Sequence, residues 1–146
     1  MSNFRLFPLF VLLGILSFNA LGQKKFEIIQ SSNDNVEVLF CDEELEASKT
    51  GILNKSNDSL VLGWRCIKNT LHEDWDYSLC EYGRCFAGIP SHSVIRPIAP
   101  KTEGFLNLHL DPNLISGKGE VIIQVYELDE PKNQKYLTFT VEAKKR

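Results

Sequence analysis

The sequence predicts an all-β protein, an antiparallel β-sandwich of about seven short strands. Apolar and polar residues alternate over several segments of five or more residues, which is the pattern of a strand with one buried face. Clusters of Asn, Asp, Ser, Pro and Gly separate these segments at short intervals, as turns do. No segment after residue 22 has the apolar period of an amphipathic helix, so sheet must pack on sheet.

Residues 1–22 predict a secretory signal peptide. Arg5 is the only charge in this segment, an apolar run follows it, and the small residues Ala20 and Gly22 lie just before Gln23, as at a cleavage site. The apolar run is shorter than the roughly 20 residues that span a membrane. We therefore expect one mature domain, residues 23–146, that is secreted, periplasmic or held at the cell surface.

The first half of the mature chain contains four expected strands, each bounded by polar residues. They cover residues 25–30, 36–40, 45–53 and 59–69. The polar loop 54–58 separates the last two strands and predicts a hairpin. Within the strand 59–69, Trp64 falls on the apolar face and is expected in the core, whereas Arg65 faces outward.

The second half begins with an irregular region, residues 72–100, which contains Trp75, two cysteines and three prolines. This composition predicts a long crossover loop pinned by a disulfide. Three strands with regular alternation follow, over residues 105–110, 119–128 and 136–142. Their apolar faces predict core positions at Leu106, Leu108, Leu110, Val121, Ile123, Val125, Leu137, Phe139 and Val141.

The four cysteines of the chain, Cys41, Cys66, Cys80 and Cys85, predict two disulfides, because an even number in an exported protein is typical of paired thiols. Cys80 and Cys85 flank a short turn in which Gly83 can adopt a positive φ. We therefore expect the pairs Cys80–Cys85 and Cys41–Cys66. The spacing lacks the Cys-x-x-Cys pairs of zinc sites and of thioredoxin-like redox sites, so no metal or other cofactor is expected.

Several motifs along residues 45–142 occur in a characteristic order. They are the loop 54–58, Leu62-Gly63-Trp64-Arg65, Trp75 before the cysteine pair, the segment 106–113 (LNLHLDPN) and Gly117-Lys118-Gly119. In this order they resemble secreted immunoglobulin-like modules of Gram-negative bacteria, often found beside type IX secretion sorting tails. The second half is also similar to ASPM/SPD-2/hydin-type modules and pilus chaperones. The resemblance implies an immunoglobulin-like antiparallel β-sandwich and says little about activity.

Two features depart from that pattern. Cys41 and Cys66 are additions to it. No sorting tail follows the last strand. Export across the outer membrane is therefore not predicted by this pattern, and we expect a periplasmic or surface-associated location as readily as free secretion.

A polar cluster over residues 72–77 is the one candidate for site chemistry. It combines His72 with three carboxylates, and we expect a solvated loop with Trp75 in the core. The alternative is a cation-binding protein, since hard cations such as calcium take several oxygen ligands, or a small exported hydrolase. Either alternative requires His72, Asp74, Asp76 and, for the hydrolase, His92 to converge in one pocket. No catalytic residue is predicted otherwise, because the sequence lacks a Gly-x-Ser-x-Gly elbow.

The most partner-like residues surround the predicted disulfide turn. Tyr82, Arg84 and Phe86 project there, and Tyr and Arg are enriched among residues that dominate interfaces. We expect an exported non-catalytic binding or assembly module that contacts a protein or glycan partner. The net charge is −3, or −4 without Arg5, which argues against a nucleic-acid partner. The mature part contains no apolar run of membrane-spanning length.

Two further expectations concern the surface. An apolar, unpaired strand edge at residues 36–40 would suit a structural envelope component that pairs by β-strand addition, whereas charges guarding it would disfavour this role. The loop 54–58 carries N-glycan acceptor motifs at Asn54 and Asn57 and a short O-glycosylation motif at Ser59.

Overall fold

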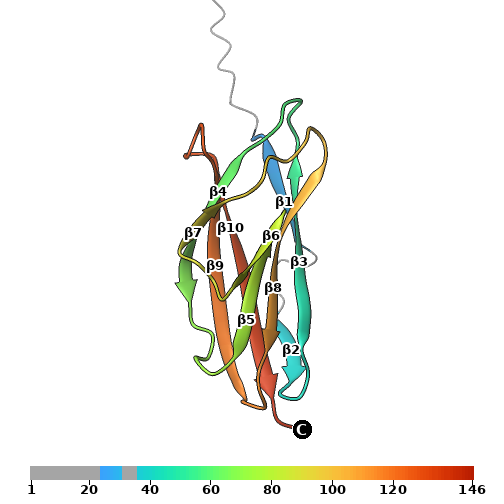
Figure 1. Cartoon of the computed structure of the whole chain (residues 1–146), viewed down its shortest axis with the longest axis vertical. Helices are drawn as coiled ribbons and strands as arrows, with labels where there is room; N and C mark the ends of the chain where they lie inside the picture. Colours follow the sequence, from blue (N-terminus) through green and yellow to red (C-terminus); the bar gives the residue numbers. More distant parts are fainter. Residues whose placement is uncertain (1–23, 31–35) are drawn as a thin grey trace, which may run out of the picture.

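The computed structural model describes residues 24–30 and 36–146, so the predicted signal peptide, residues 1–22, lies outside the described residues. Within them the chain forms ten strands and no helix. The strands build two sheets, A and B, that pack face to face (Figure 1). None of the described segments forms a helix that is long and apolar enough to cross a membrane.

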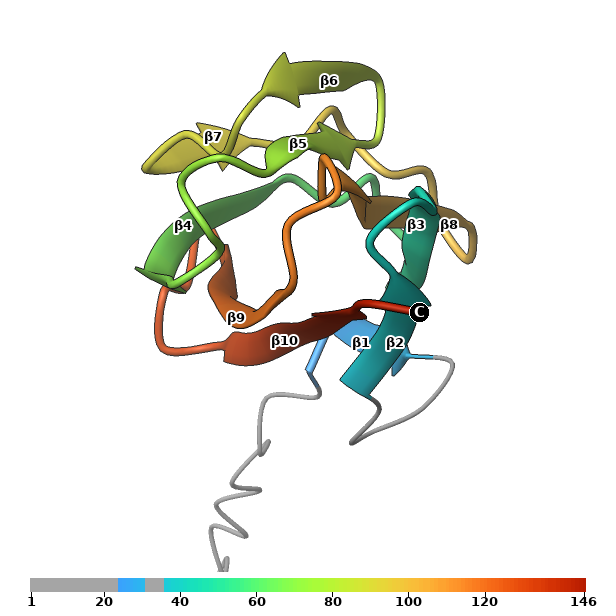
Figure 2. The ribbon, with the colours of Figure 1, turned by 90° about the horizontal axis from the view of Figure 1, so that it is seen from below.

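Each sheet has five strands. Sheet A has the order β1 (Phe26–Gln30), β3 (Leu45–Asn54), β8 (Glu103–Asp111), β5 (Asp76–Glu81) and β6 (Arg84–Ala87). Sheet B has the order β2 (Val36–Phe40), β10 (Gln134–Lys144), β9 (Gly117–Glu127), β4 (Leu62–Asn69) and β7 (His92–Val94). Seen along the long axis, the sheets enclose a common interior (Figure 2).

The strand order is that of an immunoglobulin-like sandwich, as predicted. β1, β3, β8 and β5 correspond to strands A, B, E and D, and β10, β9 and β4 to strands G, F and C. These seven strands pair antiparallel, and the short strands β2, β6 and β7 extend the sheets. One pair departs from the predicted antiparallel arrangement, because β2 runs parallel to β10.

The core consists of the inward-facing residues of both sheets, and the predicted alternation is confirmed. All nine core positions expected from the last three long strands are buried. Trp64 and Trp75 are buried as well. Trp64 lies on β4, which is strand C, the place of the buried tryptophan in immunoglobulin domains.

The predicted hairpin at residues 54–58 is wrong. The strands on either side, β3 and β4, belong to different sheets, so this loop passes from sheet A to sheet B. Its polar residues suit either connection, and the choice depends on distant partners: β3 pairs with β8 and β4 pairs with β9.

The irregular crossover predicted for residues 72–100 contains three strands, β5, β6 and β7. β5 lies between β8 and β6 in sheet A. The alternation was hard to see there because β5 carries polar residues on both faces, including the buried carboxylate of Glu81. The strands β6 and β7 are too short to show a period.

Of the two expected disulfides, Cys80–Cys85 is present and Cys41–Cys66 is not, since both of these thiols are free. Cys66 lies on β4, whereas Cys41 directly follows β2 at the edge of the same sheet. Three strand spacings separate β2 from β4, about 14 Å. This exceeds the roughly 7 Å between Cα atoms that a disulfide can bridge.

The start of β1 is anchored by an ion pair. Lys25 Nζ lies 3.2 Å from Glu127 Oε2, and the backbone N–H of Lys25 donates to Glu127 Oε1. The hydrogen bond with Glu127 raises the pKa of Lys25 above its ordinary value of 10.5.

We predict that this pair stabilises the fold at neutral pH and ceases to do so in strong alkali. Because the folded-state pKa of Lys25 exceeds the unfolded one, its contribution is complete below pH 10.5 and is lost as the pH rises further. Urea unfolding of Lys25→Met and of the wild-type protein should therefore give a constant free-energy difference from pH 7 to 9.5. That difference should shrink above pH 10.5; a difference that grows there would contradict the assignment.

Candidate functional site

The β5–β6 hairpin is closed by a short turn, Tyr82-Gly83, and by the disulfide between Cys80 and Cys85. The two cysteines are directly opposite each other in the strand pair. Gly83 has a φ of 104°, a conformation that L side chains rarely adopt. The hairpin is therefore held both by covalent bonding and by a residue suited to its turn.

A buried carboxylate joins this hairpin to the opposite sheet. Glu81, on β5, is only 1% exposed. Its Oε2 accepts a hydrogen bond of 2.5 Å from Trp64 Nε1, and its Oε1 accepts one of 2.6 Å from Arg84 Nε. Ser93 Oγ also donates to Oε1. Because Trp64 and Ser93 belong to sheet B, this network ties the two sheets together at the hairpin.

Of the three predicted contact residues, two take part in the packing around this network and one lies in the turn. Arg84 donates through Nη2 to Ser93 Oγ and to the carbonyl oxygen of Val94, and its guanidinium lies over the Phe86 ring. Phe86 in turn packs edge-on against Trp64. Arg84 and Phe86 thus pack against the hairpin and stabilise it, whereas Tyr82 lies in the turn, 37% exposed and edge-on against the ring of Phe105.

Removing the disulfide should destabilise the domain moderately. The bond closes a loop of residues 80–85, for which the loop-entropy model gives about 2 kcal/mol. We predict this loss for Cys80→Ser/Cys85→Ser in urea unfolding followed by tryptophan fluorescence. The Cys41→Ser variant lacks any cross-link to lose and measures the cost of replacing a buried thiol alone. An unchanged midpoint for the double variant would contradict the prediction.

The pocket that a hydrolase or cation site would need does not form from the predicted residues. His72 and Asp74 contact each other, with 3.8 Å between Nδ1 and Oδ2. Asp76, however, begins β5 in sheet A, whereas His92 lies on β7 at the edge of sheet B. Within residues 24–30 and 36–146, no three His, Cys, Asp or Glu side chains are grouped to hold a metal ion.

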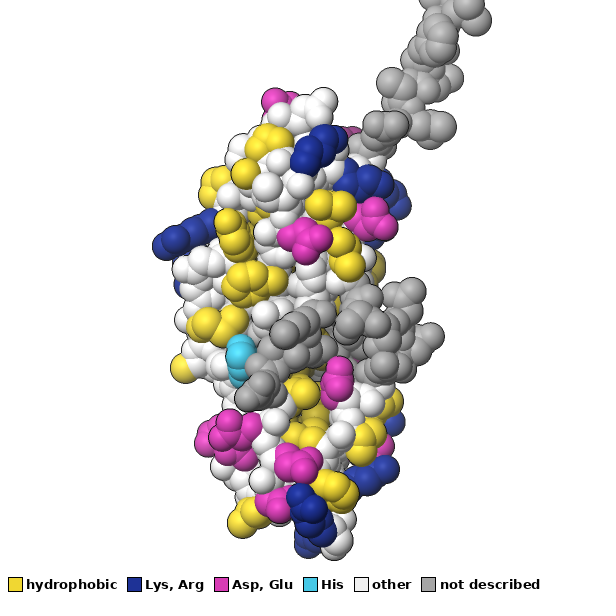
Figure 3. Space-filling model, turned by 90° about the vertical axis from the view of Figure 1, so that its right-hand side faces the viewer, with side chains coloured by type: hydrophobic (Ala, Val, Ile, Leu, Met, Phe, Trp, Pro, Cys, Tyr) yellow, Lys and Arg dark blue, Asp and Glu magenta, His cyan; other side chains and the backbone are white. Residues whose placement is uncertain are grey.

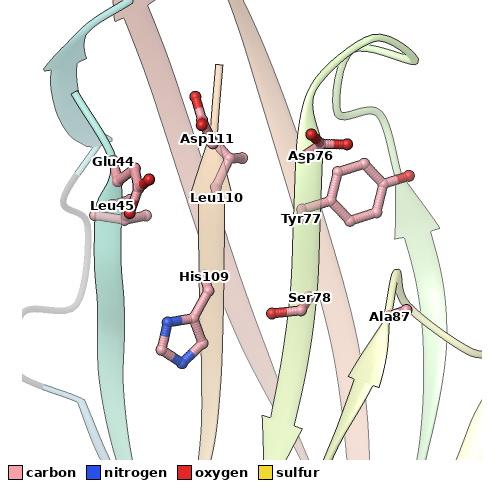
Figure 4. A pocket seen from close by; sticks show the side chains of 9 residues that line it. All are labelled: Glu44, Leu45, Asp76, Tyr77, Ser78, Ala87, His109, Leu110 and Asp111. Atoms are coloured by element: carbon pink, nitrogen blue, oxygen red, sulfur yellow. The ribbon is translucent and has the colours of Figure 1, made fainter. Parts of the chain in front are cut away.

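Asp76 instead borders a shallow hollow of about 600 Å³ on the outer side of sheet A. Asp76 faces Asp111 across the β5–β8 pair, and Ser78 faces His109. In Figure 4 the side chains of Asp76, Asp111 and His109 point apart rather than toward one centre. The hollow therefore offers scattered polar groups and no assembled catalytic set.

The charges on one face of the molecule are mixed. On the face shown in Figure 3, Lys and Arg side chains are interspersed with Asp and Glu. Near the C-terminus, Arg146 pairs with Asp42 and Glu43 and lies over the ring of Phe40. The part of this face visible in Figure 3 therefore carries both signs of charge.

A second candidate surface, missed in the sequence, lies on the outward side of sheet B. Its residues form two rows across β7, β4, β9 and β10, and together we call them the sheet B face. The first row contains Val94, Gly63, Tyr126 and Gln134, and the second contains His92, Arg65, Gln124 and Tyr136.

The side chains of the sheet B face are mutually ordered. A Cβ at Gly63 would lie 2.7 Å from Tyr126 Cζ, so the Tyr126 ring lies across the glycine. Gln124, although it points outward, is only 2% exposed. Its Oε1 accepts from Arg65 Nε, and its Nε2 donates to Gln134 Oε1 and to Tyr136 Oη. An interior glycine such as Gly63 in a strand pattern signals a close approach, and that signal could have led to this surface.

The glycan motifs of the loop 54–58 are not equally accessible. Asn54 is 0% exposed, and its Nδ2 donates to the carbonyl oxygens of Asp58, Ile98 and Ala99. The folded protein therefore offers no acceptor at Asn54, which corrects the expectation for that residue. Asn57 and Ser59 are exposed, and their modification remains a prediction.

The edge strand β2 has an unpaired side with exposed apolar residues, and charged side chains cover one end of it. Among the described strands it pairs only with β10, and Val36, Val38 and Phe40 are exposed. At its end, Glu43 Oε2 accepts from the backbone N–H of Phe40, and Arg146 covers the ring of Phe40. The open part of the edge is therefore short.

Comparisons with known proteins agree with this architecture. No family model and no curated protein match the chain. Among solved structures, the N-terminal domain of PorA is similar with a TM-score of 0.62 and 16% identity, over 82% of this chain and 97% of that one. Self-complemented MyfA, the major subunit of Myf fimbriae from Yersinia enterocolitica, has a TM-score of 0.47 and 15% identity, over 82% and 98%.

At this level of identity the likeness concerns the fold alone. The strand order and the similarity to the PorA domain together define the chain as an immunoglobulin-like β-sandwich module. This fold hosts many functions, so the function has to be argued from the surfaces described above.

Proposed function

We propose that this protein is an exported, non-catalytic binding or assembly module that contacts a protein partner through the tip of the β5–β6 hairpin. The observation that carries this proposal is the bracing of the hairpin by the Cys80–Cys85 bond and by the buried Glu81. A rigid element loses little conformational freedom on binding. The half-exposed Tyr82 at its tip supplies an aromatic anchor.

Two further features support an exported role. Residues 1–22 have the pattern of a signal peptide, and a disulfide persists mainly in oxidising compartments. We therefore place the protein in the periplasm, at the cell surface or in the medium, where its partner would also be found.

Strand addition at β2 is a second candidate for the contact. Cys41 N–H donates to the carbonyl oxygen of Lys144 on β10, so the backbone groups of Val36 and Val38 point the other way, toward the open edge. Their exposed apolar side chains favour an added strand. The charged cap formed by Glu43 and Arg146 limits the length of such a pairing.

Site-specific photo-crosslinking in the native host distinguishes these contacts. A photoreactive residue is placed at Tyr82, at Val38 or, as a control in the turn between β9 and β10, at Lys132, which is exposed. We expect one discrete cross-linked product from position 82 and none from position 132. A product from position 38 alone would replace the hairpin by the β2 edge. Equal cross-linking at all three positions, or none at 82 and 38, would overturn the proposal.

A further inference from the structure

The sheet B face presents aromatic side chains that no described strand or loop covers. The Tyr126 ring lies across Gly63, and the residue is partly exposed. Tyr136, on the neighbouring strand β10, is 58% exposed. The two tyrosines thus occupy adjacent rows on the outward side of sheet B.

The polar groups around these rings are held in place. The buried amide of Gln124 binds Arg65, Gln134 and Tyr136 at once. In the described part of the chain, the Nη atoms of Arg65 and the Nε2 of Gln134 donate to no protein acceptor. Donors that are oriented by a supporting residue and left without a partner are suited to an external ligand.

The positive charge of Arg65 on this surface is also not neutralised by any described carboxylate. Several cations elsewhere are ion-paired, namely Lys25, Lys55, Lys68, Arg84, Lys144 and Arg146. Arg65 makes no ion pair with any described carboxylate, and no Asp or Glu occupies a position of the sheet B face. A guanidinium with free Nη atoms forms a fork that matches a carboxylate.

The shape of the surface selects among carboxylate-bearing ligands. The three hollows described on the molecule are lined by none of the eight residues of the sheet B face. A pyranose ring needs no hollow, because its C–H face stacks on an aromatic ring while its hydroxyl groups accept from fixed amides.

We propose that the sheet B face binds an acidic glycan: Arg65 pairs with a sugar carboxylate, Tyr126 and Tyr136 stack on the rings, and Gln134 binds hydroxyl groups. This site uses different residues from the hairpin tip, so it goes beyond the proposed protein contact. The experiment that tests it is independent of the cross-linking experiment. It would place the module on a carboxylated polysaccharide while the hairpin contacts a protein.

Calorimetric titration of the mature protein tests the proposal directly. The probes are tetramers of galacturonic, mannuronic and glucuronic acid, an α2,8-linked sialic acid tetramer, the methyl ester of each of these tetramers, and a glutamate tetrapeptide. We expect at least one acidic tetramer to bind, its neutral counterpart to bind at least tenfold more weakly, and the peptide not to bind. In nitrogen-edited NMR spectra the side-chain amide signals of Gln124 and Gln134 should shift on binding.

Single substitutions test the role proposed for each side chain in glycan binding. Arg65→Gln should weaken binding of the acidic tetramer at least tenfold and leave the weak binding of the ester unchanged. Tyr136→Ala should weaken both, and Tyr136→Phe, which keeps the ring, should largely restore them. Arg146→Gln makes the same charge change outside the face and should have no effect. Thermal unfolding of each variant checks that the fold is intact.

Three results would overturn the proposal. The first is that no acidic tetramer binds the wild-type protein. The second is that Arg65→Gln and Arg146→Gln weaken binding equally, which would indicate non-specific attraction. The third is that the glutamate peptide binds as tightly as the sugars, which would point to a protein ligand. Cross-linking through Tyr82 could persist in all three cases.

Discussion

Replacing Asn54 with aspartate is expected to lower the free energy of unfolding by about 4 kcal/mol, a large part of the stability of a small domain. The Nδ2 of Asn54 donates to three carbonyl oxygens, those of Asp58, Ile98 and Ala99. Its Oδ1 accepts from the backbone N–H and the hydroxyl of Ser56. An aspartate keeps the acceptor but places a negative charge against three acceptors in a buried site.

The measurement is urea unfolding followed by the fluorescence of Trp64 and Trp75, both of which are buried. Asn57→Asp is the matched control, because it makes the same chemical change in the same loop at an exposed residue. We expect that control to lie within about 0.5 kcal/mol of the wild-type protein. Similar losses for the two variants would mean that Asn54 does not hold the loop to the segment around Ile98.

The second large effect is expected at the Glu81 network. Glu81 is 1% exposed in the wild-type protein. Arg84→Met removes the cation that faces this carboxylate, and breaking a buried pair in this way typically costs about 3–5 kcal/mol. Because the side chain of Arg84 is 51% exposed, water screens the pair and we expect about 2–3 kcal/mol. Glu81→Gln in the Arg84→Met background should recover most of this loss, since an amide still accepts from Trp64.

A double-mutant cycle of Glu81→Gln and Arg84→Met measures the coupling. Lys68→Met is the control, since it breaks an ion pair with Glu120 in which both side chains are partly exposed. Such pairs contribute less than about 1 kcal/mol. If Arg84→Met cost no more than Lys68→Met, the buried carboxylate would not depend on its cation.

The sequence predicted strands and their buried faces well because these depend on local alternation. Leu106, Leu137 and the other expected core residues are buried where the period of two places them. The Cys80–Cys85 pair was predictable for the same reason, since a single turn brings both residues together. The segment 72–100 was misread because β5 is too polar, and β6 and β7 too short, to show a period.

The candidate surfaces were harder to predict because they join residues that are distant in the sequence. Tyr82 was expected at the surface and is partly exposed, but the supporting roles of Arg84 and Phe86 depend on Trp64 of the other sheet. The sheet B face likewise needs the register of β4, β9 and β10. Arg65 was recognised as outward-facing, yet its partner Gln124 is visible only once the strands are paired.

By itself, the sequence determined seven of the ten described strands, the burial of both tryptophans, the local Cys80–Cys85 disulfide and the class of sandwich. Only the tertiary structure decided that residues 54–58 cross between sheets, that Cys41 and Cys66 stay apart, and that Gln124 orders a row of exposed side chains. The physical reason is that alternation and turn chemistry act between near neighbours in the chain. Strand partners are chosen instead by the burial of the whole apolar surface, which no local pattern contains.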